Sequence, residues 1–274
     1  MLKINWPNKK ILTYSIWIVA IILRFYGATR TSHPYDMGTF EAWSRGFWHF
    51  GPRDFFGSLW SDYLPLPILT FAPISLFAEA LGATYGLVFK LFHIVFELVL
   101  IALLPTTSLI PKILLLLSPA LIGDTAFWGQ VDSIPSLLTL LSLSLLMKPI
   151  KENNKKGTVI PALLLGLAVA YKPIMVIVAP VLWIVSLKRK ISWWKLPLIS
   201  SLVFFATALP FASSLASVPS LMYERILGQA GTYPHLSINA FNFWTIIPSH
   251  NWTSDTSTVL GISGRFVGLS IFFL

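Results

Sequence analysis

Long apolar runs separated by short polar segments dominate the chain. A helix needs ~20 mainly apolar residues to cross the hydrocarbon core of a bilayer, and most of these runs approach that length. The pattern predicts seven helices, at residues 11–26, 85–104, 112–128, 131–147, 158–171, 174–187 and 196–215. The fifth and sixth runs are the shortest, so we expect them to recruit flanking residues or to lie in a thin, polar-lined part of the bundle.

One further apolar run, residues 65–80, is expected not to cross. It contains three prolines and Glu79, and proline inside a helix removes a backbone hydrogen bond. One extra crossing would also invert every later segment. We therefore expect a juxtamembrane or re-entrant helix, which leaves residues 28–84 as a long outer loop.

Composition agrees with a membrane protein and excludes an ordinary soluble domain. Hydrophobic residues make up 55% of the 274 positions and charged residues 11%, whereas charged residues are about a quarter of a soluble domain. Mean hydropathy is +0.73. The chain has no cysteine, which excludes disulfides and thiolate metal sites.

The net charge of +9 would suggest nucleic acid in a soluble protein, but the basic residues cluster between apolar runs, so we expect no nucleic-acid partner. Clusters lie at residues 3–10, at Lys112, and at residues 148–156 and 188–195. The positive-inside rule makes them cytoplasmic. Residues 28–84, 123–132, 171–173 and about 213–258 then face outward, with nine of the eleven acids, so any chemistry is expected on the outer side.

The first outer loop is too long for a simple connection and too aromatic for disorder. Phe40, Trp43, Phe47 and Phe50 recur at helical spacing, which predicts an amphipathic interfacial helix with Asp36 at its N-terminal end. On this pattern alone, Asp36 is either a cap of that helix or a catalytic carboxylate.

A second outer element joins two helices. It carries Asp124, Trp128, Gln130 and Asp132. Amide and carboxylate groups beside an aromatic face suit a sugar ring, so the segment is either a hydroxyl-binding patch or a solvated turn with an interfacial tryptophan.

Other polar residues occur near or inside the apolar runs. Lys172 is a lone cation in a short outer turn, either a phosphate ligand or a snorkelling lysine. The later loop with Arg225, Asn239 and Asn242 is either a ligand lid or packing.

Three ionisable residues share one face of the second predicted helix. Lys90, His93 and Glu97 fall at i, i+3 and i+7, so this face is expected to point into the bundle. We expect a structural ion pair there.

Five motifs in order carry a resemblance to a known family. YDMGTFEAWSR, SDYLPLP, SPALIGDTAFWGQVDS, YKP and LSINAFNFW together resemble the polytopic lipid-sugar-dependent glycosyltransferases of the GT-C superfamily. The similarity covers about residues 11–245. It is closest to bacterial and archaeal relatives of the GPI-anchor second mannosyltransferase, and more distant to the glucosyltransferases of N-glycan assembly.

The resemblance implies a seven-helix all-α bundle whose first outer loop folds into juxtamembrane helices. It implies Asp36 as general base, Gln130 and Asp132 at the sugar site, and Lys172 near the lipid phosphate. Further substrate-binding candidates are Glu41, Asp62, Tyr63, Asp124, Trp128, Arg225, Asn239 and Asn242.

Two departures from the family pattern stand out. The family's Asp-Tyr-Pro-Pro appears here as Asp62-Tyr63-Leu64-Pro65, and family members generally continue beyond residue 274 with further helices. We therefore expect residues 1–274 to form a single transmembrane module that lacks its C-terminal part.

The implied activity is transfer of a hexose, mannose by resemblance, from a polyprenyl-phosphate sugar to an acceptor hydroxyl with inversion. The acceptor is a glycolipid, a glycan or a protein, and the implied setting is a prokaryotic plasma membrane with the site facing outward. Asp36, Asp62, Asp124 and Asp132 offer oxygen ligands for Mg²⁺ or Mn²⁺, although no spacing demands a metal. The alternative is a transporter or flippase for a lipid-linked or small anionic substrate.

Overall fold

The computed structural model describes residues 9–30, 32–106, 108–148, 157–189, 192–228, 232–236, 244, 253–259 and 261–273. Its elements are α1 (Lys9–Ala28), α2 (Pro34–Phe50), α3 (Phe55–Ser58), α4 (Pro65–Leu81), α5 (Tyr85–Leu103), α6 (Leu109–Leu116), α7 (Pro119–Ile122), η1 (Gly123–Trp128), α8 (Ser133–Leu146), α9 (Val159–Tyr171), η2 (Pro173–Val178), α10 (Ala179–Lys188), α11 (Lys195–Ala206), η3 (Leu215–Ser217), α12 (Val218–Leu227), β1 (Thr258–Val259), β2 (Ile262–Ser263) and α13 (Gly264–Phe273). The prediction of a helical fold is confirmed, apart from one short hairpin.

The chain forms two compact units, Met1–Met222 and Tyr223–Leu274. The first contains α1 to α11 and the candidate site around Asp36. In the second, β1 and β2 pair antiparallel with Thr258 opposite Ser263, and Arg265 Nε donates to Asp255 Oδ2 at 2.7 Å. Each unit is described by itself.

Three helical segments are long and apolar enough to cross a membrane. Among the described residues these are Lys10–Ala28, Tyr85–Leu103 and Leu109–Trp128. The other apolar helices of the first unit are shorter: α4, α8, α9, α11 and the segment Pro173–Lys188. The three long segments indicate a membrane protein, while seven crossings and a non-crossing α4 stay predictions.

Three of the predicted helices are interrupted, and proline explains two of them. The run 174–187 begins as the 3-10 segment η2 and continues as α10. The run 112–128 is divided because Pro119 holds Ser118 in an extended conformation (φ −62°, ψ 117°), as a proline does to the residue before it. The chain continues as α7 and then the π-helical turn η1. The run 196–215 is helical only to Ala206, since Pro210 has no N–H to extend the ladder.

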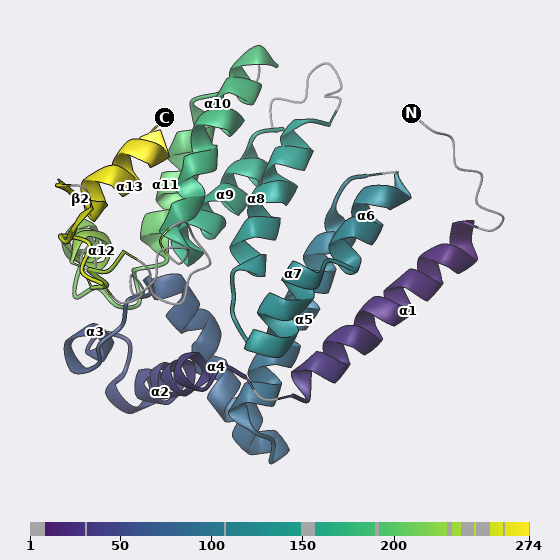
Figure 1. Cartoon of the computed structure of the whole chain (residues 1–274), viewed down its shortest axis with the longest axis horizontal. Coiled ribbons are helices and arrows are strands. Elements are labelled where there is room, and N and C mark those ends of the chain that lie inside the picture. The colour runs from purple at the N-terminus through teal and green to yellow at the C-terminus, as the bar shows by residue number, and fades with distance from the viewer. Residues whose placement is uncertain are drawn as a thin grey trace. The chain divides into compact units, whose positions relative to one another are not determined.

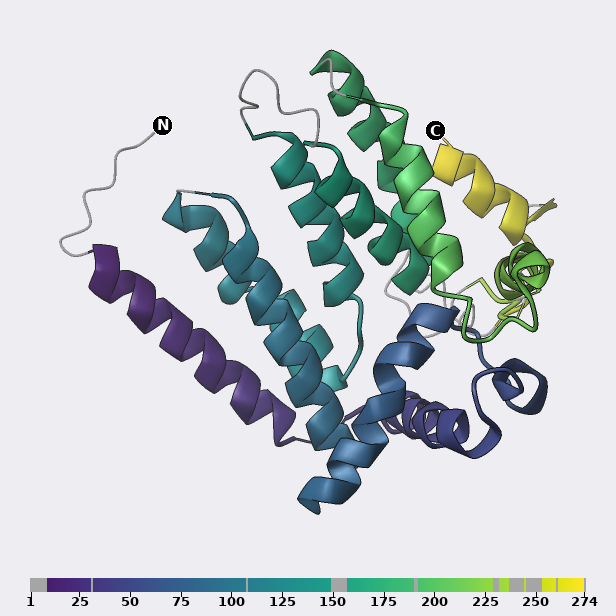
Figure 2. The same cartoon turned by 180° about the vertical axis from the view of Figure 1, so that it is seen from behind.

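Apart from α2 to α4, the helical segments of the first unit run alternately up and down (Figures 1 and 2). Figures 1 and 2 both show the start of α1, the connection from α5 to α6, the end of α8 and the connection from α10 to α11 at one end, and α2 and α3 toward the other. Arg189 Nη1 donates to the Lys148 carbonyl, which joins the ends of α10 and α8. The described parts of the basic clusters therefore share one end.

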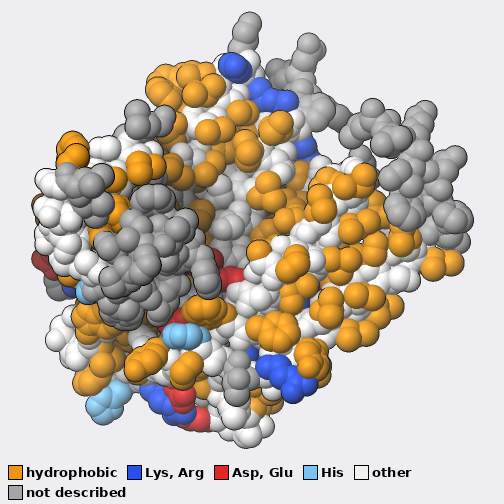
Figure 3. Space-filling model, in the orientation of Figure 1, with side chains coloured by type: hydrophobic (Ala, Val, Ile, Leu, Met, Phe, Trp, Pro, Cys, Tyr) orange, Lys and Arg blue, Asp and Glu red, His pale blue; other side chains and the backbone are white. Residues whose placement is uncertain are grey.

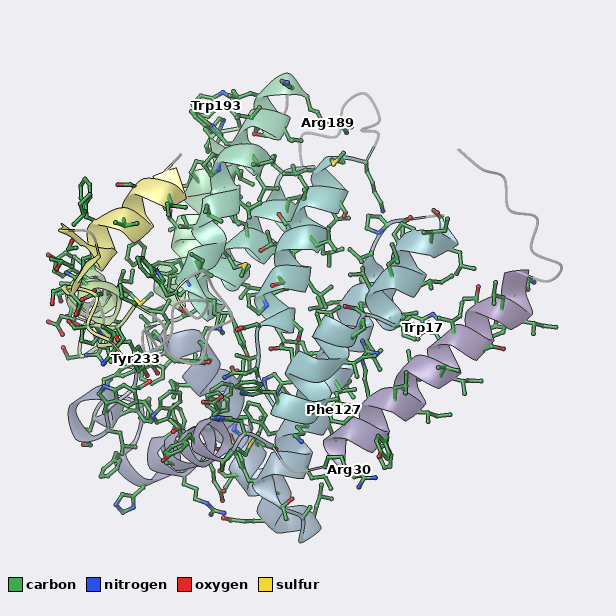
Figure 4. All side chains as sticks on the ribbon, in the orientation of Figure 1. Trp17, Arg30, Phe127, Arg189, Trp193 and Tyr233 are labelled. Carbon is green, nitrogen blue, oxygen red and sulfur yellow. The ribbon has the colours of Figure 1, made fainter. Side chains whose placement is uncertain are left out.

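The surface of the first unit follows the same division. Figure 3 shows hydrophobic side chains over the face that includes α1 and α6, with basic side chains near the top of α10. Figure 4 shows Arg189 and Trp193 at that end, and Arg30 and Phe127 at the opposite end, beside the last turn of α1. A belt of exposed apolar side chains between two polar ends suits a bilayer.

Helices α2 and α4 pack tightly where the first outer loop was predicted. Pro73 lies inside α4, and the Ser44 hydroxyl from α2 enters the helix ladder nearby. That hydroxyl donates to the Phe71 carbonyl at 2.7 Å and accepts from the Ser75 N–H at 3.2 Å. Trp48 Nε1 donates to the Ala72 carbonyl at 2.6 Å. These bonds fix the α2 helix that carries Asp36.

Candidate functional site

Asp36 lies in the first turn of α2 and does not cap the helix. The N-cap residue is His33, which makes no side-chain cap hydrogen bond. Instead, Asp36 Oδ2 accepts hydrogen bonds from Trp128 Nε1 at 2.7 Å and from Gln130 Nε2 at 2.6 Å. The Asp36 side chain is 28% exposed, and its Oδ1 accepts no hydrogen bond from the residues that the structure describes. One oxygen is thus held and the other is accessible.

His33 joins this cluster and was not among the residues selected from the sequence. The His33 ring stacks on Trp128 with ring centroids 4.9 Å apart and planes 14° from parallel. The backbone N–H of His33 donates to the Trp128 carbonyl at 3.0 Å. Nδ1 lies 3.4 Å from Asp36 Oδ2. The sequence offered a signal for His33, which lies three residues before Asp36 and directly before Pro34, a residue that favours the start of a helix.

The two donors to Asp36 come from a tight turn after η1. The Asp124 carbonyl accepts from the N–H groups of Gly129 and Gln130 at 3.0 and 2.9 Å. Gly129 has φ +85°, and a Cβ there would lie 2.6 Å from Met37 Cε. The positive φ favours glycine at this position, and any other residue would also have to move the end of the Met37 side chain. Single π-helical turns are rare and often occur at functional sites.

Tyr63 orients Gln130. The Tyr63 hydroxyl donates to Gln130 Oε1 at 3.4 Å, so the Gln130 amide nitrogen is left to face Asp36. Burial raises the pKa of Tyr63 well above its ordinary value, and the charges of Asp132, Asp62 and Asp36 raise it further. The phenol therefore stays protonated as a donor.

Lys172 is paired with a carboxylate at the edge of the same cluster. Its Nζ forms an ion pair with Asp132 Oδ1, and the Lys172 and Asp132 side chains are 27% and 51% exposed. The preceding residue, Tyr171, is anchored by its hydroxyl, which lies 3.0 Å from Thr70 Oγ1 and 3.2 Å from His93 Nε2. The ammonium group is thus fixed rather than extended along lipid.

The remaining candidates have other surroundings. Asp124 Oδ2 accepts from the Ser133 N–H at 3.1 Å, at the first residue of α8. Glu41 pairs with Arg45 at 3.0 Å, and Arg45 also pairs with Glu79; no described contact joins Glu41 to Asp36. Arg225 lies in α12 in the second unit, and Asn239 and Asn242 lie outside the described residues.

The polar face of α5 is buried as expected, but its ion pair differs from the one expected. Glu97 pairs with Arg24 of α1, whose Nε donates to Glu97 Oε1 at 2.7 Å. Lys90 Nζ donates to the Arg30 carbonyl at 2.8 Å, and His93 faces Tyr171. Arg24 is 0% exposed; its position within an apolar run was a signal that the sequence offered.

No group of three or more His, Asp or Glu side chains that could hold a metal ion occurs among the described residues. Comparison with protein families, with curated proteins and with solved structures finds no match to this chain.

Proposed function

We propose that this chain is a glycosyltransferase that moves a hexose from a polyprenyl-phosphate sugar to an acceptor hydroxyl on the outer face of a membrane. The observation that carries the proposal is the Asp36 carboxylate, with Oδ2 held by Trp128 and Gln130 and Oδ1 accessible. The sequence resemblance supplies the donor class and the preference for mannose.

The proposed reaction needs one base and one cation. The acceptor oxygen attacks the anomeric carbon and forms the new glycosidic bond, while Asp36 Oδ1 takes the proton of the acceptor hydroxyl. The bond from the anomeric carbon to the phosphate oxygen breaks, and polyprenyl phosphate leaves as an anion. Attack opposite the phosphate inverts the anomeric configuration. A phosphate leaving group requires no general acid.

The surroundings of Asp36 suit these roles. Trp128 and Gln130 hold the carboxylate in one orientation, and orientation of a reacting group is a large part of catalysis. The indole of Trp128 is 43% exposed and offers a flat face to a sugar ring. Lys172, ion-paired with Asp132, is the cation assigned to the departing phosphate.

The buried polar side chains of α5 favour transfer over transport. A transporter or flippase would use intramembrane ionisable residues along a path. Here Glu97 is engaged by Arg24 and Thr125, and His93 by Tyr171. Trp128, Gln130 and His33 lie instead around the partly exposed Asp36.

The test uses the purified full chain in lipid nanodiscs with polyprenyl-phosphate mannose. Glycolipid, oligosaccharide and peptide acceptors are offered in turn, and both mannosylated product and released polyprenyl phosphate are measured. Asp36→Asn should lower transfer by roughly 10²- to 10⁴-fold, whereas Glu79→Gln, an exposed acid outside the cluster, should keep it. Uptake of the donor into liposomes without bond formation would favour the transporter and overturn the proposal.

A further inference from the structure

A chain of buried hydrogen bonds leads from Arg24, near the C-terminal end of α1, to the turn that faces Asp36. Arg24 Nε donates to Glu97 Oε1 at 2.7 Å, and Glu97 Oε2 accepts from Thr125 Oγ1 at 2.6 Å. The hydroxyls of Thr125 and Ser133 lie 2.8 Å apart. All four side chains are at most 2% exposed. The chain crosses α1, α5, η1 and α8.

The same arginine also secures the end of α6. Arg24 Nη1 donates to the Leu116 carbonyl at 2.6 Å, and Leu116 is the last residue of α6. The last carbonyls of a helix have no partner within the helix. Arg24 therefore satisfies an otherwise unpaired group where the chain turns toward η1.

Thr125 and Ser133 flank the segment that serves Asp36. Thr125 lies inside η1, which ends at Trp128, and Ser133 opens α8 just after Gln130. The Asp124 carboxylate accepts from the Ser133 N–H, which closes the segment on itself. The turn that carries the Asp36 donors is therefore held at both ends. Thr125 is hydrogen-bonded to Glu97, and the hydroxyls of Thr125 and Ser133 are hydrogen-bonded to each other.

A buried ion pair is a costly way to stabilise a bundle, since apolar residues of the same shape serve equally well or better. Such a pair can instead specify one arrangement of the groups bound to it, as buried polar groups do in coiled coils. The π-helical turn η1 lies between the groups of this hydrogen-bond chain, since Thr125 is inside η1 and Ser133 follows it.

We infer that Arg24, Glu97 and Thr125 are positioning residues, which hold η1 so that Trp128 and Gln130 both donate to Asp36. This inference rests on the proposed function for its effect on turnover. Its geometric claim, that the buried chain sets the placement of Trp128, is independent of which reaction occurs.

The geometric claim is tested with 5-fluorotryptophan and fluorine NMR on the full chain in micelles. The chain has 11 tryptophans, and Trp128→Phe identifies the Trp128 resonance by its loss. Thr125→Val removes the hydroxyl and keeps the shape, and it should shift or broaden this resonance. Thr125→Ser should restore it. The matched control is Thr139→Val, which removes a buried hydroxyl that donates to the Pro135 carbonyl within α8.

A second variant changes the residues of the hydrogen-bond chain that lie outside η1. The double substitution Arg24→Met with Glu97→Leu leaves Thr125 in place but removes its partner, and it should move the Trp128 resonance as Thr125→Val does. An unchanged Trp128 resonance in both variants overturns the inference, whatever the activity.

Measuring turnover beside the Trp128 resonance distinguishes failure of this inference from failure of the proposed function. In Thr125→Val, kcat should fall by up to about 10²-fold with KM for the lipid donor unchanged, and Thr125→Ser should recover it. If the unsubstituted chain transfers no hexose to any acceptor, the proposed function fails, while the shift of the Trp128 resonance still decides the positioning claim. A shifted resonance with unchanged kcat contradicts the role of these residues in the reaction.

Discussion

Asp36 and Glu97 are both carboxylates held by hydrogen bonds, yet their surroundings are opposite. Asp36 accepts from two neutral donors at one oxygen, and its side chain is 28% exposed. Glu97 uses one oxygen for the Arg24 guanidinium and the other for the Thr125 hydroxyl, and it is 0% exposed. The first has an oxygen that a substrate can reach, and the second has none.

The difference in exposure and partners distinguishes a reactive carboxylate from a structural one more clearly than residue type does. A buried charge without its partner is strongly unfavourable, so Glu97 and Arg24 depend on each other. A carboxylate that is partly in water keeps solvation when a neighbour is removed. The two regions should therefore respond in opposite ways to substitution, Asp36 in activity and Glu97 in stability.

The largest expected effect on stability follows from breaking the buried pair. Glu97→Leu leaves Arg24 as a buried cation without its carboxylate, which should lower the free energy of unfolding by about 3–5 kcal/mol. Asp36→Asn should lower it by about 1 kcal/mol or less. Thermal unfolding in the same detergent compares them, and equal losses would contradict the distinction between the two carboxylates.

Removing both charges together sharpens the comparison. Arg24→Met combined with Glu97→Leu exchanges the ion pair for apolar groups, and such exchanges are often neutral or stabilising. The double variant should regain most of the stability that Glu97→Leu loses. Thermal unfolding of the two single variants and the double variant forms a cycle, and additive losses would show that the pair is not coupled.

The sequence pattern predicted where helices occur better than what their polar residues contact. The run 85–104 and the helix Tyr85–Leu103 agree within one residue, because an apolar run of that length is a local property. The break at Ser118 was not predicted, although Pro119 restricts the conformation of that residue. Both ends of α8 and of α9 were predicted within two residues.

The contacts of the site could not be predicted from such patterns. Asp36 and Gln130 are 94 positions apart, and Arg24 and Glu97 are 73 apart. Helical periodicity relates residues three or four positions apart, so it grouped Glu97 with Lys90 and His93. Only packing of α1 against α5 supplies Arg24. The grouping of Asp36 with Gln130 was expected from the family resemblance rather than from spacing.

A smaller effect is expected from removing one donor to Asp36. Trp128→Phe keeps a ring to stack on His33 but loses the bond to the carboxylate. Loss of this bond lets the carboxylate turn out of its reactive orientation, so turnover should fall about 10- to 100-fold. Stability should fall by only about 0.5–1.5 kcal/mol, since the bond is partly exposed. The control is Trp48→Phe, which makes the same chemical change on α2 but loses a bond to the Ala72 carbonyl. Comparable losses of turnover in both variants would contradict the claim that the Trp128 hydrogen bond to Asp36 supports turnover.

The smallest effect on stability is expected at a third group of carboxylates, which are paired with a cation, like Glu97, and exposed to solvent, like Asp36. Glu41 and Glu79 pair with Arg45, as Glu97 pairs with Arg24, but their side chains are 38% and 57% exposed. Arg45 donates hydrogen bonds to Glu41 and Glu79, and these bonds raise the pKa of Arg45, so it stays charged. Arg45→Gln should lower stability by at most about 1 kcal/mol, since water screens exposed pairs.

Salt distinguishes this surface group from the buried pair. The loss caused by Arg45→Gln should shrink between low and high ionic strength because exposed charges are screened by mobile ions. The loss caused by Glu97→Leu should not change, since no ions reach a side chain with 0% exposure. If both losses respond equally to salt, then pairing rather than burial governs these carboxylates. In that case Asp36 would differ from Glu97 only by lacking a cation.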